Sequence, residues 1–126
     1  MTHPLTKNIL GRTGLEVTNL GYGAMEIRGG PRGREVSDED AGAILNAVLD
    51  SGINFIDTSI DYGRSEELIG EYISHRRSEF YLATKCGCAA IPEAAGEHVF
   101  TRENIVAGVE QSLKRMRTNH LDIVQF

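Results

Sequence analysis

The sequence lacks tryptophan, has only three prolines, and contains no long apolar run. No stretch approaches the ~18 consecutive apolar residues that a membrane-spanning helix requires. The first residues, Met1 to Lys7, do not show the positively charged and then apolar pattern of an export signal. These absences predict a cytoplasmic protein without a membrane partner.

Cysteine and histidine are also scarce. The two cysteines, Cys86 and Cys88, are separated by one residue, which is neither the C-x-x-C spacing of redox proteins nor part of a zinc-binding pair. The four histidines form no His-x-x-x-His or His-Cys group, and they are His3, His75, His98 and His120. We therefore expect no metal site.

Positive charge is neither abundant nor clustered. The formal net charge of the 126 residues is -5, and lysine and arginine are spread along the chain. A nucleic-acid surface would need them gathered on one face, so nucleic acid is not an expected partner. With 40% hydrophobic and 25% charged residues, the chain has the composition of one soluble domain that buries roughly two-thirds of its unfolded surface.

Short apolar stretches separated by glycine begin the chain. Residues 8–17 place two of these stretches around a Gly-x-x-Gly loop, which predicts a β-hairpin. A third run, residues 20–25, contains two glycines that would let another backbone or a ligand approach closely, as in the first strand of a barrel. Residues 29–33 are rich in glycine and predict a loop.

Amphipathic helices and short strands then alternate. Ser37 is the expected N-cap of the first helix, Ser65 begins the second, and Thr101 caps the third. The apolar face of the third helix is predicted by residues at helical spacing, which are Ile105, Val109, Leu113 and Met116. The intervening strands are expected at residues 53–57, 79–84 and 121–125.

Strands joined by helix-length crossovers must run parallel, with helices covering the sheet. Two α/β architectures satisfy this, an open doubly wound sheet and a (β/α)8 barrel. A doubly wound nucleotide-binding fold should carry G-x-G-x-x-G between its first strand and first helix. Residues 21–26 lack the third glycine and lie well before Ser37.

Barrels place reactive groups at the carboxyl ends of strands, where Asp57 and Lys85 fall, so the barrel is favoured. A complete barrel needs about 200 residues or more. The expected fold is therefore a partial (β/α)8 TIM barrel of the α/β class, with an N-terminal β-hairpin plus about four parallel strands and three helices.

An acid, a phenol and an ammonium group follow two neighbouring strands. The apolar run that begins at Gly52 ends on Asp57, Tyr62 comes five residues later, and the next run ends on Lys85. An ammonium ion beside a phenol stabilises the phenolate, and a carboxylate can hold that ammonium ion. The three residues therefore predict a proton-transfer site. The structural alternative is that Asp57 caps a loop, Tyr62 is a loop aromatic and Lys85 is a solvated strand end.

A family resemblance covers the whole chain and is carried by three stretches. They are residues 52–66, with GINFIDTS followed by YG and SE; residues 82–87, LATKCG; and residues 112–124, with SLKRM and LDIV. Together they resemble the aldo-keto reductases, nicotinamide-dependent enzymes built on a (β/α)8 barrel whose floor is closed by an N-terminal hairpin. The DTS and TKCG sequences are most similar to the branch that acts on sugars and small aldehydes. The resemblance implies a small-molecule carbonyl or sugar substrate.

The resemblance also implies roles for the clustered residues. Tyr62 resembles the family's proton donor to the substrate carbonyl oxygen, Lys85 the cation that activates it, and Asp57 the carboxylate paired with that lysine. Hydride addition to a carbonyl makes an alkoxide, which a phenol beside an ammonium ion can protonate. The implied reaction is NAD(P)H-dependent reduction of an aldehyde or ketone to an alcohol, or its reverse.

The implied cofactor is NADP, with NAD as the alternative. The resemblance implies that five residues of this chain contact the nicotinamide end of the cofactor. They are Gly23, Ala24, Met25, Asp57 and Tyr62. In the family, most contacts to the rest of the dinucleotide, including its adenosine phosphate, come from later strands.

The family's fourth catalytic residue is a histidine just after the fourth strand, which would be expected next after Phe126. His120 lies before that strand and cannot replace it. We therefore expect residues 1–126 to be the N-terminal half of an aldo-keto reductase (NADP-dependent oxidoreductase) barrel domain, truncated and inactive alone. Its unpaired strand edges predict self-association or aggregation.

Two other interpretations remain open at this point. The chain could be a noncatalytic cofactor-binding or regulatory subunit with an aldo-keto reductase fold, since some family members serve as subunits of other complexes. It could also be an unfolded remnant without function. The intact Asp57, Tyr62 and Lys85 favour the enzyme over the subunit.

Overall fold

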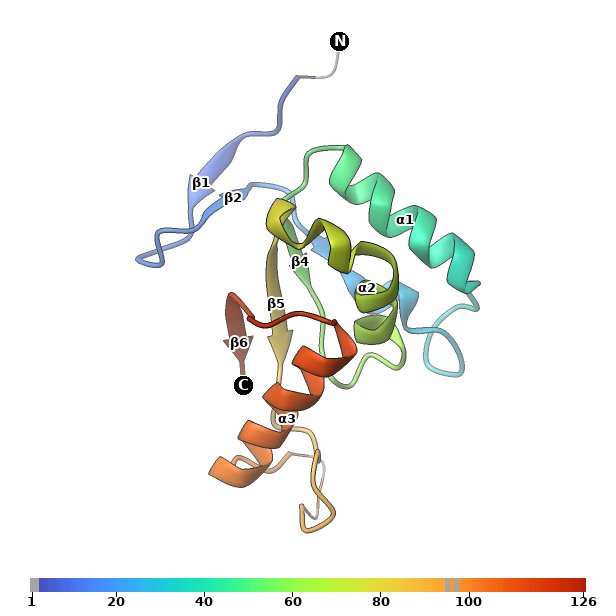
Figure 1. The fold of residues 1–126 in the computed structure, drawn as a ribbon, viewed down its shortest axis with the longest axis vertical. Coiled ribbons are helices and arrows are strands. Elements are labelled where there is room, and N and C mark those ends of the chain that lie inside the picture. Colours follow the sequence, from blue (N-terminus) through green and yellow to red (C-terminus); the bar gives the residue numbers. More distant parts are fainter. Residues whose placement is uncertain (1–2, 95, 97) are drawn as a thin grey trace.

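The computed structural model describes residues 3–94, 96 and 98–126. Met1 and Thr2, which begin the segment considered for an export signal, lie outside the described residues. Within these residues, none of the helices combines the length and the apolar character that crossing a bilayer requires. The elements in chain order are β1 Lys7–Ile9, β2 Glu16–Thr18, β3 Tyr22–Gly23, η1 Ala24–Arg28, α1 Asp38–Asp50, β4 Phe55–Asp57, α2 Ser65–Ile73, η2 Ser74–Glu79, β5 Tyr81–Lys85, α3 Arg102–Arg115 and β6 Ile123–Gln125 (Figure 1).

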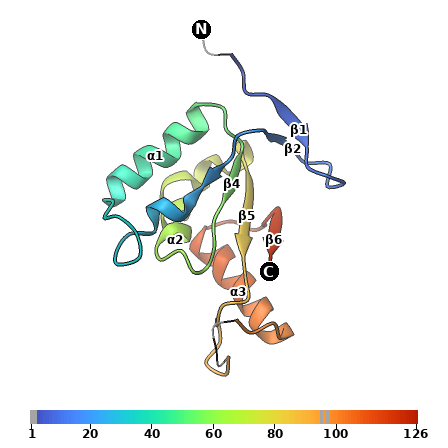
Figure 2. The ribbon, with the colours of Figure 1, turned by 180° about the vertical axis from the view of Figure 1, so that it is seen from behind.

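The strands form two sheets in the described part of the chain. β1 and β2 pair antiparallel as the predicted hairpin, and β3, β4, β5 and β6 form a parallel sheet in that order. The three α-helices lie on one face of the parallel sheet, and Figure 2 shows the strands from the other side with the helices behind them. Consecutive β/α units in a barrel wall have this arrangement, which confirms the predicted fold class.

The hydrophobic core lies between the helices and the parallel sheet. Its fully buried side chains come from both layers and include Leu45 of α1, Ile69 and Ile73 of α2, Ile56 of β4 and Leu82 of β5. Full burial of one such side chain contributes roughly 1.5–3 kcal/mol to stability. The amphipathic pattern of the first two helices is therefore confirmed as a core-facing pattern.

The predicted helix starts agree with the structure. Ser37 Oγ accepts a hydrogen bond from the backbone N–H of Asp40 at 3.0 Å, and Thr101 Oγ1 accepts one from Asn104 at 3.3 Å. Each cap satisfies an N–H group that has no partner within the helix. The second helix begins at Ser65 as predicted.

The first parallel strand is shorter than residues 20–25 predicted. β3 contains only Tyr22 and Gly23, because the chain turns into a 3-10 helix at Ala24. Ala24 is fully buried, and its carbonyl accepts a hydrogen bond from Ser65 Oγ at 2.9 Å. This contact with the first residue of α2 holds the turn in place.

The third helix packs only in part through the face that its apolar spacing predicted. Of the four predicted residues, Met116 is buried as expected, but Ile105, Val109 and Leu113 are only half-buried, whereas Asn104, Gly108 and Ser112 are buried. A Cβ added to Gly108 would lie 3.3 Å from the Cys86 Cβ, so glycine lets α3 pack closely beside the end of β5. The Asn104 side chain accepts a hydrogen bond from the backbone of Ala90 at 2.7 Å. Small and hydrogen-bonding residues therefore make this contact, which an apolar pattern does not reveal.

Hydrogen bonds close the amino ends of the strands. Asn54, directly before β4, accepts the backbone N–H of Thr18 at 2.7 Å and donates its own N–H to Thr18 Oγ1 at 3.2 Å. Arg77 donates to Asp122 Oδ2 at 2.8 Å, and that oxygen also accepts the backbone N–H of Leu82. These contacts tie the hairpin and the strands together at one end of the sheet. The predicted functional residues lie at the other end.

Candidate active site

The three predicted catalytic residues lie at the carboxyl end of the parallel sheet. Asp57 ends β4, Lys85 ends β5, and Tyr62 lies in the loop between β4 and α2. The Tyr62 N–H donates to the Ser59 carbonyl at 3.1 Å, and the Tyr62 carbonyl accepts from the Ser65 N–H at 2.8 Å. The main chain on both sides of the phenol is therefore fixed by local hydrogen bonds.

Glycine is required directly after Tyr62. Gly63 has φ +48°, and a Cβ added to it would lie 2.5 Å from the carbonyl oxygen of Arg28. A larger residue would push the loop away from the end of η1. Gly63 therefore lets the Tyr62 loop contact the segment that follows β3.

Lys85 brings the cluster together. Its Nζ donates to Asp57 Oδ2 and to the Thr58 carbonyl, both at 2.8 Å. The same Nζ lies over the Tyr62 ring, 4.8 Å from the ring centroid. The structure thus places the predicted acid, phenol and ammonium group in one cluster.

The cluster is partly shielded from solvent. The side chains of Lys85 and Asp57 are 33% and 34% exposed. Burial lowers the pKa of Lys85, but the Asp57 carboxylate and the neighbouring Tyr62 hydroxyl more than offset that effect, and the net pKa is raised. Lys85 therefore carries its positive charge throughout the neutral pH range.

The second carboxylate oxygen of Asp57 also has a partner. Gln125, the last residue of β6, donates from Nε2 to Asp57 Oδ1 at 2.7 Å. Residue-by-residue reasoning on the sequence missed Gln125, although it ends a parallel strand just as Asp57 and Lys85 do. The sequence signal is its place at the end of a predicted strand, and the register opposite Lys85 is seen only in the structure.

The predicted cofactor-binding residues lie beside the cluster. Gly23 is paired with Asp57 in the parallel sheet, and Gly23 and Met25 are exposed. Ala24 between them is fully buried against Ser65. Of the three residues, Gly23 and Met25 have exposed surface, and Ala24 is buried.

A buried ion pair supports the site from the helix side. Glu66 is 1% exposed, and its carboxylate accepts from Thr84 Oγ1 at 3.0 Å and from Arg115 Nη1 at 3.2 Å. Arg115 Nη1 also donates to the carbonyl of Ile60, in the loop that carries Tyr62, at 3.3 Å. Glu66 of α2 therefore links Thr84, the residue before Lys85, to Arg115 of α3.

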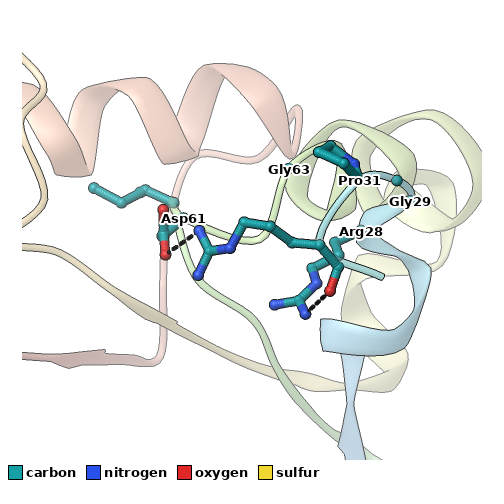
Figure 3. A pocket seen from close by; sticks show the side chains of 8 residues that line it. Arg28, Gly29, Pro31, Asp61 and Gly63 are labelled. Carbon is teal, nitrogen blue, oxygen red and sulfur yellow. Dashed lines mark hydrogen bonds and ion pairs between the residues drawn. The ribbon is translucent and has the colours of Figure 1, made fainter. Parts of the chain in front are cut away.

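A pocket of about 270 Å³ adjoins the loop that carries Tyr62 (Figure 3). The segment from Arg28 to Arg32 forms one side, and Ile60, Asp61 and Gly63 form the other. Arg32 reaches across to Asp61 Oδ2 at 3.0 Å. Asp57 and Lys85 do not line this pocket, so it is a neighbour of the cluster and not its binding cavity.

The structure combines part of an α/β barrel wall with an N-terminal hairpin. An acid, a phenol and an ammonium group lie together at the carboxyl ends of its strands. The aldo/keto reductase family model matches residues 19–126. The chain therefore belongs to the aldo/keto reductase family, which confirms the resemblance in its sequence.

Individual relatives come from plants and bacteria. A protein of Oryza sativa subsp. japonica named "Probable voltage-gated potassium channel subunit beta" is 34% identical over 120 residues, covering 91% of this chain and 35% of that protein. The L-galactose dehydrogenase of Arabidopsis thaliana is 34% identical over 122 residues, with coverage of 91% and 35%. An aldo-keto reductase from Bacillus halodurans, solved in its holo form, has a TM-score of 0.81 at 29% identity and is matched over 95% of this chain and 39% of its own.

The chain spans about a third of the length of these curated relatives, 35% in each case, and 39% of the solved structure. The residues matched by the family model, 19–126, contain the parallel strands that carry the cluster. The activity, substrates and partners of a whole family member therefore come to this chain only as proposals.

Proposed function

We propose that this chain supplies the proton-transfer residues of an NAD(P)H-dependent oxidoreductase that reduces an aldehyde or ketone to an alcohol, or runs the reverse reaction. The single observation that carries this proposal is the position of Lys85, which contacts the Asp57 carboxylate and the Tyr62 ring together. An ammonium ion held by a carboxylate beside a phenol is what a proton donor to a developing alkoxide needs.

Each residue has its own task in this proposal. The Tyr62 hydroxyl donates its proton to the carbonyl oxygen as negative charge develops there. Lys85 stabilises the phenolate that remains, and Asp57 keeps Lys85 charged and in place. A bound nicotinamide supplies the hydride. In the reverse direction, the Tyr62 phenolate accepts the proton of the alcohol.

The surface beside Asp57 fits the nicotinamide end of NADP, with NAD as the alternative. A Cβ added to Gly23, the residue paired with Asp57, would meet no atom within 4 Å, so the space above this backbone is open to a flat ring. Met25 is 41% exposed and Ala24 is buried. We assign Gly23, Ala24, Met25, Asp57 and Tyr62 to the nicotinamide end, with Ala24 holding the backbone of its neighbours.

We further propose that residues 1–126 are the N-terminal half of the barrel domain, that they work in the cytoplasm on a small carbonyl compound or sugar, and that they are inactive alone. Among the described residues, β3 and β6 each pair on one side only. Asp57 and Lys85 remain about one-third exposed, whereas hydride transfer needs a site that excludes water. The free strand edges also favour association with a second copy.

Fluorescence titration with NADPH tests the proposed function. It would be done on residues 1–126 and on a longer chain in which they are joined to the remaining barrel of a family relative. We expect the longer chain to bind NADPH and to oxidise it when an aldehyde or sugar is added, and the 126-residue chain to do neither. A longer chain that folds, by circular dichroism, and still does not bind NADPH would contradict the proposal.

A second candidate function is favoured by the rice relative, whose name is that of a channel subunit. In this alternative the chain belongs to a noncatalytic cofactor-binding or regulatory subunit. Such a protein would bind NADPH without turning it over, whether or not Tyr62 is replaced. Turnover that depends on Tyr62 separates the two candidates.

A further inference from the structure

The Asp57 carboxylate is held on both of its oxygens. Lys85 Nζ donates to Oδ2 at 2.8 Å, and Gln125 Nε2 donates to Oδ1 at 2.7 Å. One of these donors is charged and lies next to the phenol. The other is a neutral amide that comes from a different strand.

The barrel wall explains how Gln125 reaches Asp57. β5 lies between β4 and β6 in the sheet, and Gln125 is paired in register with Lys85. Side chains inside a (β/α)8 barrel form layers whose members come from alternate strands. Asp57 of β4 and Gln125 of β6 meet as two members of such a layer, with Lys85 of β5 beside them.

The amide has a chemistry that suits this position. Donation to Oδ1 favours the ionised carboxylate and prevents it from rotating, so that Oδ2 stays directed at Lys85. A lysine at residue 125 would compete with Lys85 for the carboxylate, and a glutamate would repel Asp57. An apolar residue would leave Oδ1 without this donor.

We propose that Gln125 is a positioning residue of the proton-transfer site, which orients Asp57 and through it keeps Lys85 beside Tyr62. A role for Gln125 in proton transfer rests on the proposed function. The coupling from Gln125 through Asp57 to Lys85 can be measured without any turnover.

The coupling is measured by following the titration of the Lys85 ammonium group by nuclear magnetic resonance in the 126-residue chain. The Tyr62→Phe background removes the neighbouring phenol, whose own titration would overlap. We expect Gln125→Met to lower the pKa of Lys85, because Asp57 is then free to turn away. Gln111→Met, the same change at a half-buried position of α3, should leave the pKa of Lys85 unaltered.

A double-mutant cycle separates positioning from a direct effect on Lys85. In the Asp57→Asn background, Gln125→Met should produce no further change, because the group through which it acts is gone. The proposal is overturned if Gln125→Met leaves the Lys85 titration unchanged, or if its effect in that background is as large as in the presence of Asp57. Gln125→Leu serves as a second variant should Gln125→Met fail to fold by circular dichroism.

Activity then connects the coupling to the proposed function. In the longer chain with a complete barrel, Gln125→Met should lower kcat on the order of tenfold and leave KM nearly unchanged, since it acts on the proton donor and not on substrate binding. If the wild-type longer chain is inactive but Gln125→Met still lowers the pKa of Lys85, the proposed function is contradicted and the coupling stands. If the longer chain is active but Gln125→Met changes neither kcat nor the pKa of Lys85, only the positioning role of Gln125 is contradicted.

Discussion

Both ends of the parallel sheet carry an acid and a base in contact, yet the two pairs are built differently. At the amino ends, Arg77 and Asp122 are each 14% exposed, and Arg77 also donates to two backbone carbonyls. At the carboxyl ends, Lys85 and Asp57 are 33% and 34% exposed, and Lys85 lies over a phenol. The amino-end pair bonds to the backbone and fixes the strands. The carboxyl-end pair contacts a proton-bearing neighbour within reach of solvent, where barrels place their chemistry.

The largest expected effect is on catalysis at the carboxyl end. In the longer chain with a complete barrel, we expect Lys85→Met to lower kcat by about 10²-fold or more, because the phenolate of Tyr62 loses its adjacent positive charge. Lys114→Met, at an exposed position of α3, is the matched control and should leave kcat unaltered. Steady-state NADPH oxidation measures both variants. Equal rates in the two variants would mean that Lys85 has no part in proton transfer.

The next effect is on stability, at the amino ends of the strands. Arg77→Met should lower the free energy of unfolding by about 3 kcal/mol, because the largely buried Asp122 carboxylate is left without its cation. Urea unfolding followed by circular dichroism measures this loss. Arg12→Met, in the exposed turn of the hairpin, should stay within about 0.5 kcal/mol of the wild type. Similar midpoints for the two variants would show that the amino-end pair does not fix the strands.

A smaller loss of stability is expected where the hairpin meets the sheet. Asn54→Ala removes the side-chain acceptor of the Thr18 N–H and should cost about 1–3 kcal/mol. Asn8→Ala removes an exposed side-chain contact with Asn19 and should cost well under 1 kcal/mol. The same urea experiment compares them. If Asn8→Ala proved the more damaging change, the hairpin would be held by its own strands and not by Asn54.

The smallest effect is the contribution of Lys85 to stability at high pH. The net pKa of Lys85 is raised above its usual value of 10.5, so its stabilisation is present below that pH and is lost as pH rises through the folded-state pKa. The effect is small, because the pair is one-third exposed. Unfolding midpoints measured from neutral pH to beyond pH 10.5 should fall more steeply for the wild type than for Lys85→Met. Parallel curves would show that folding does not raise the pKa of Lys85.

The sequence predicts those features that depend on local chemistry or on strand order. The caps at Ser37 and Thr101 follow from one side chain and the helix that begins after it, and both are confirmed. The meeting of Asp57 and Lys85 follows from parallel strands, whose carboxyl ends share one edge of the sheet. Neither prediction needs any knowledge of how side chains pack.

Other features depend on three-dimensional contacts that no spacing encodes. α3 packs through Gly108, whose backbone lies close to Cys86. Because glycine has no side chain, an apolar periodicity cannot reveal this contact. Gln125 contacts a residue two strands away, and its identity alone gives no sign of this. The early end of β3 is set by the hydrogen bond from Ser65 to Ala24, between residues far apart in the sequence.

We propose above all that the Tyr62 phenol is the proton donor of a carbonyl reductase. It is tested most directly by single-turnover oxidation of bound NADPH in the longer chain, with Tyr62→Phe compared with Tyr81→Phe at the opposite end of the sheet. We expect Tyr62→Phe to slow the step by about 10²–10⁴-fold while Tyr81→Phe retains the wild-type rate. Equal rates of oxidation in all three proteins, with NADPH bound in each, would contradict the claim. Bound NADPH with no oxidation in any of them would contradict it too and would favour the noncatalytic subunit.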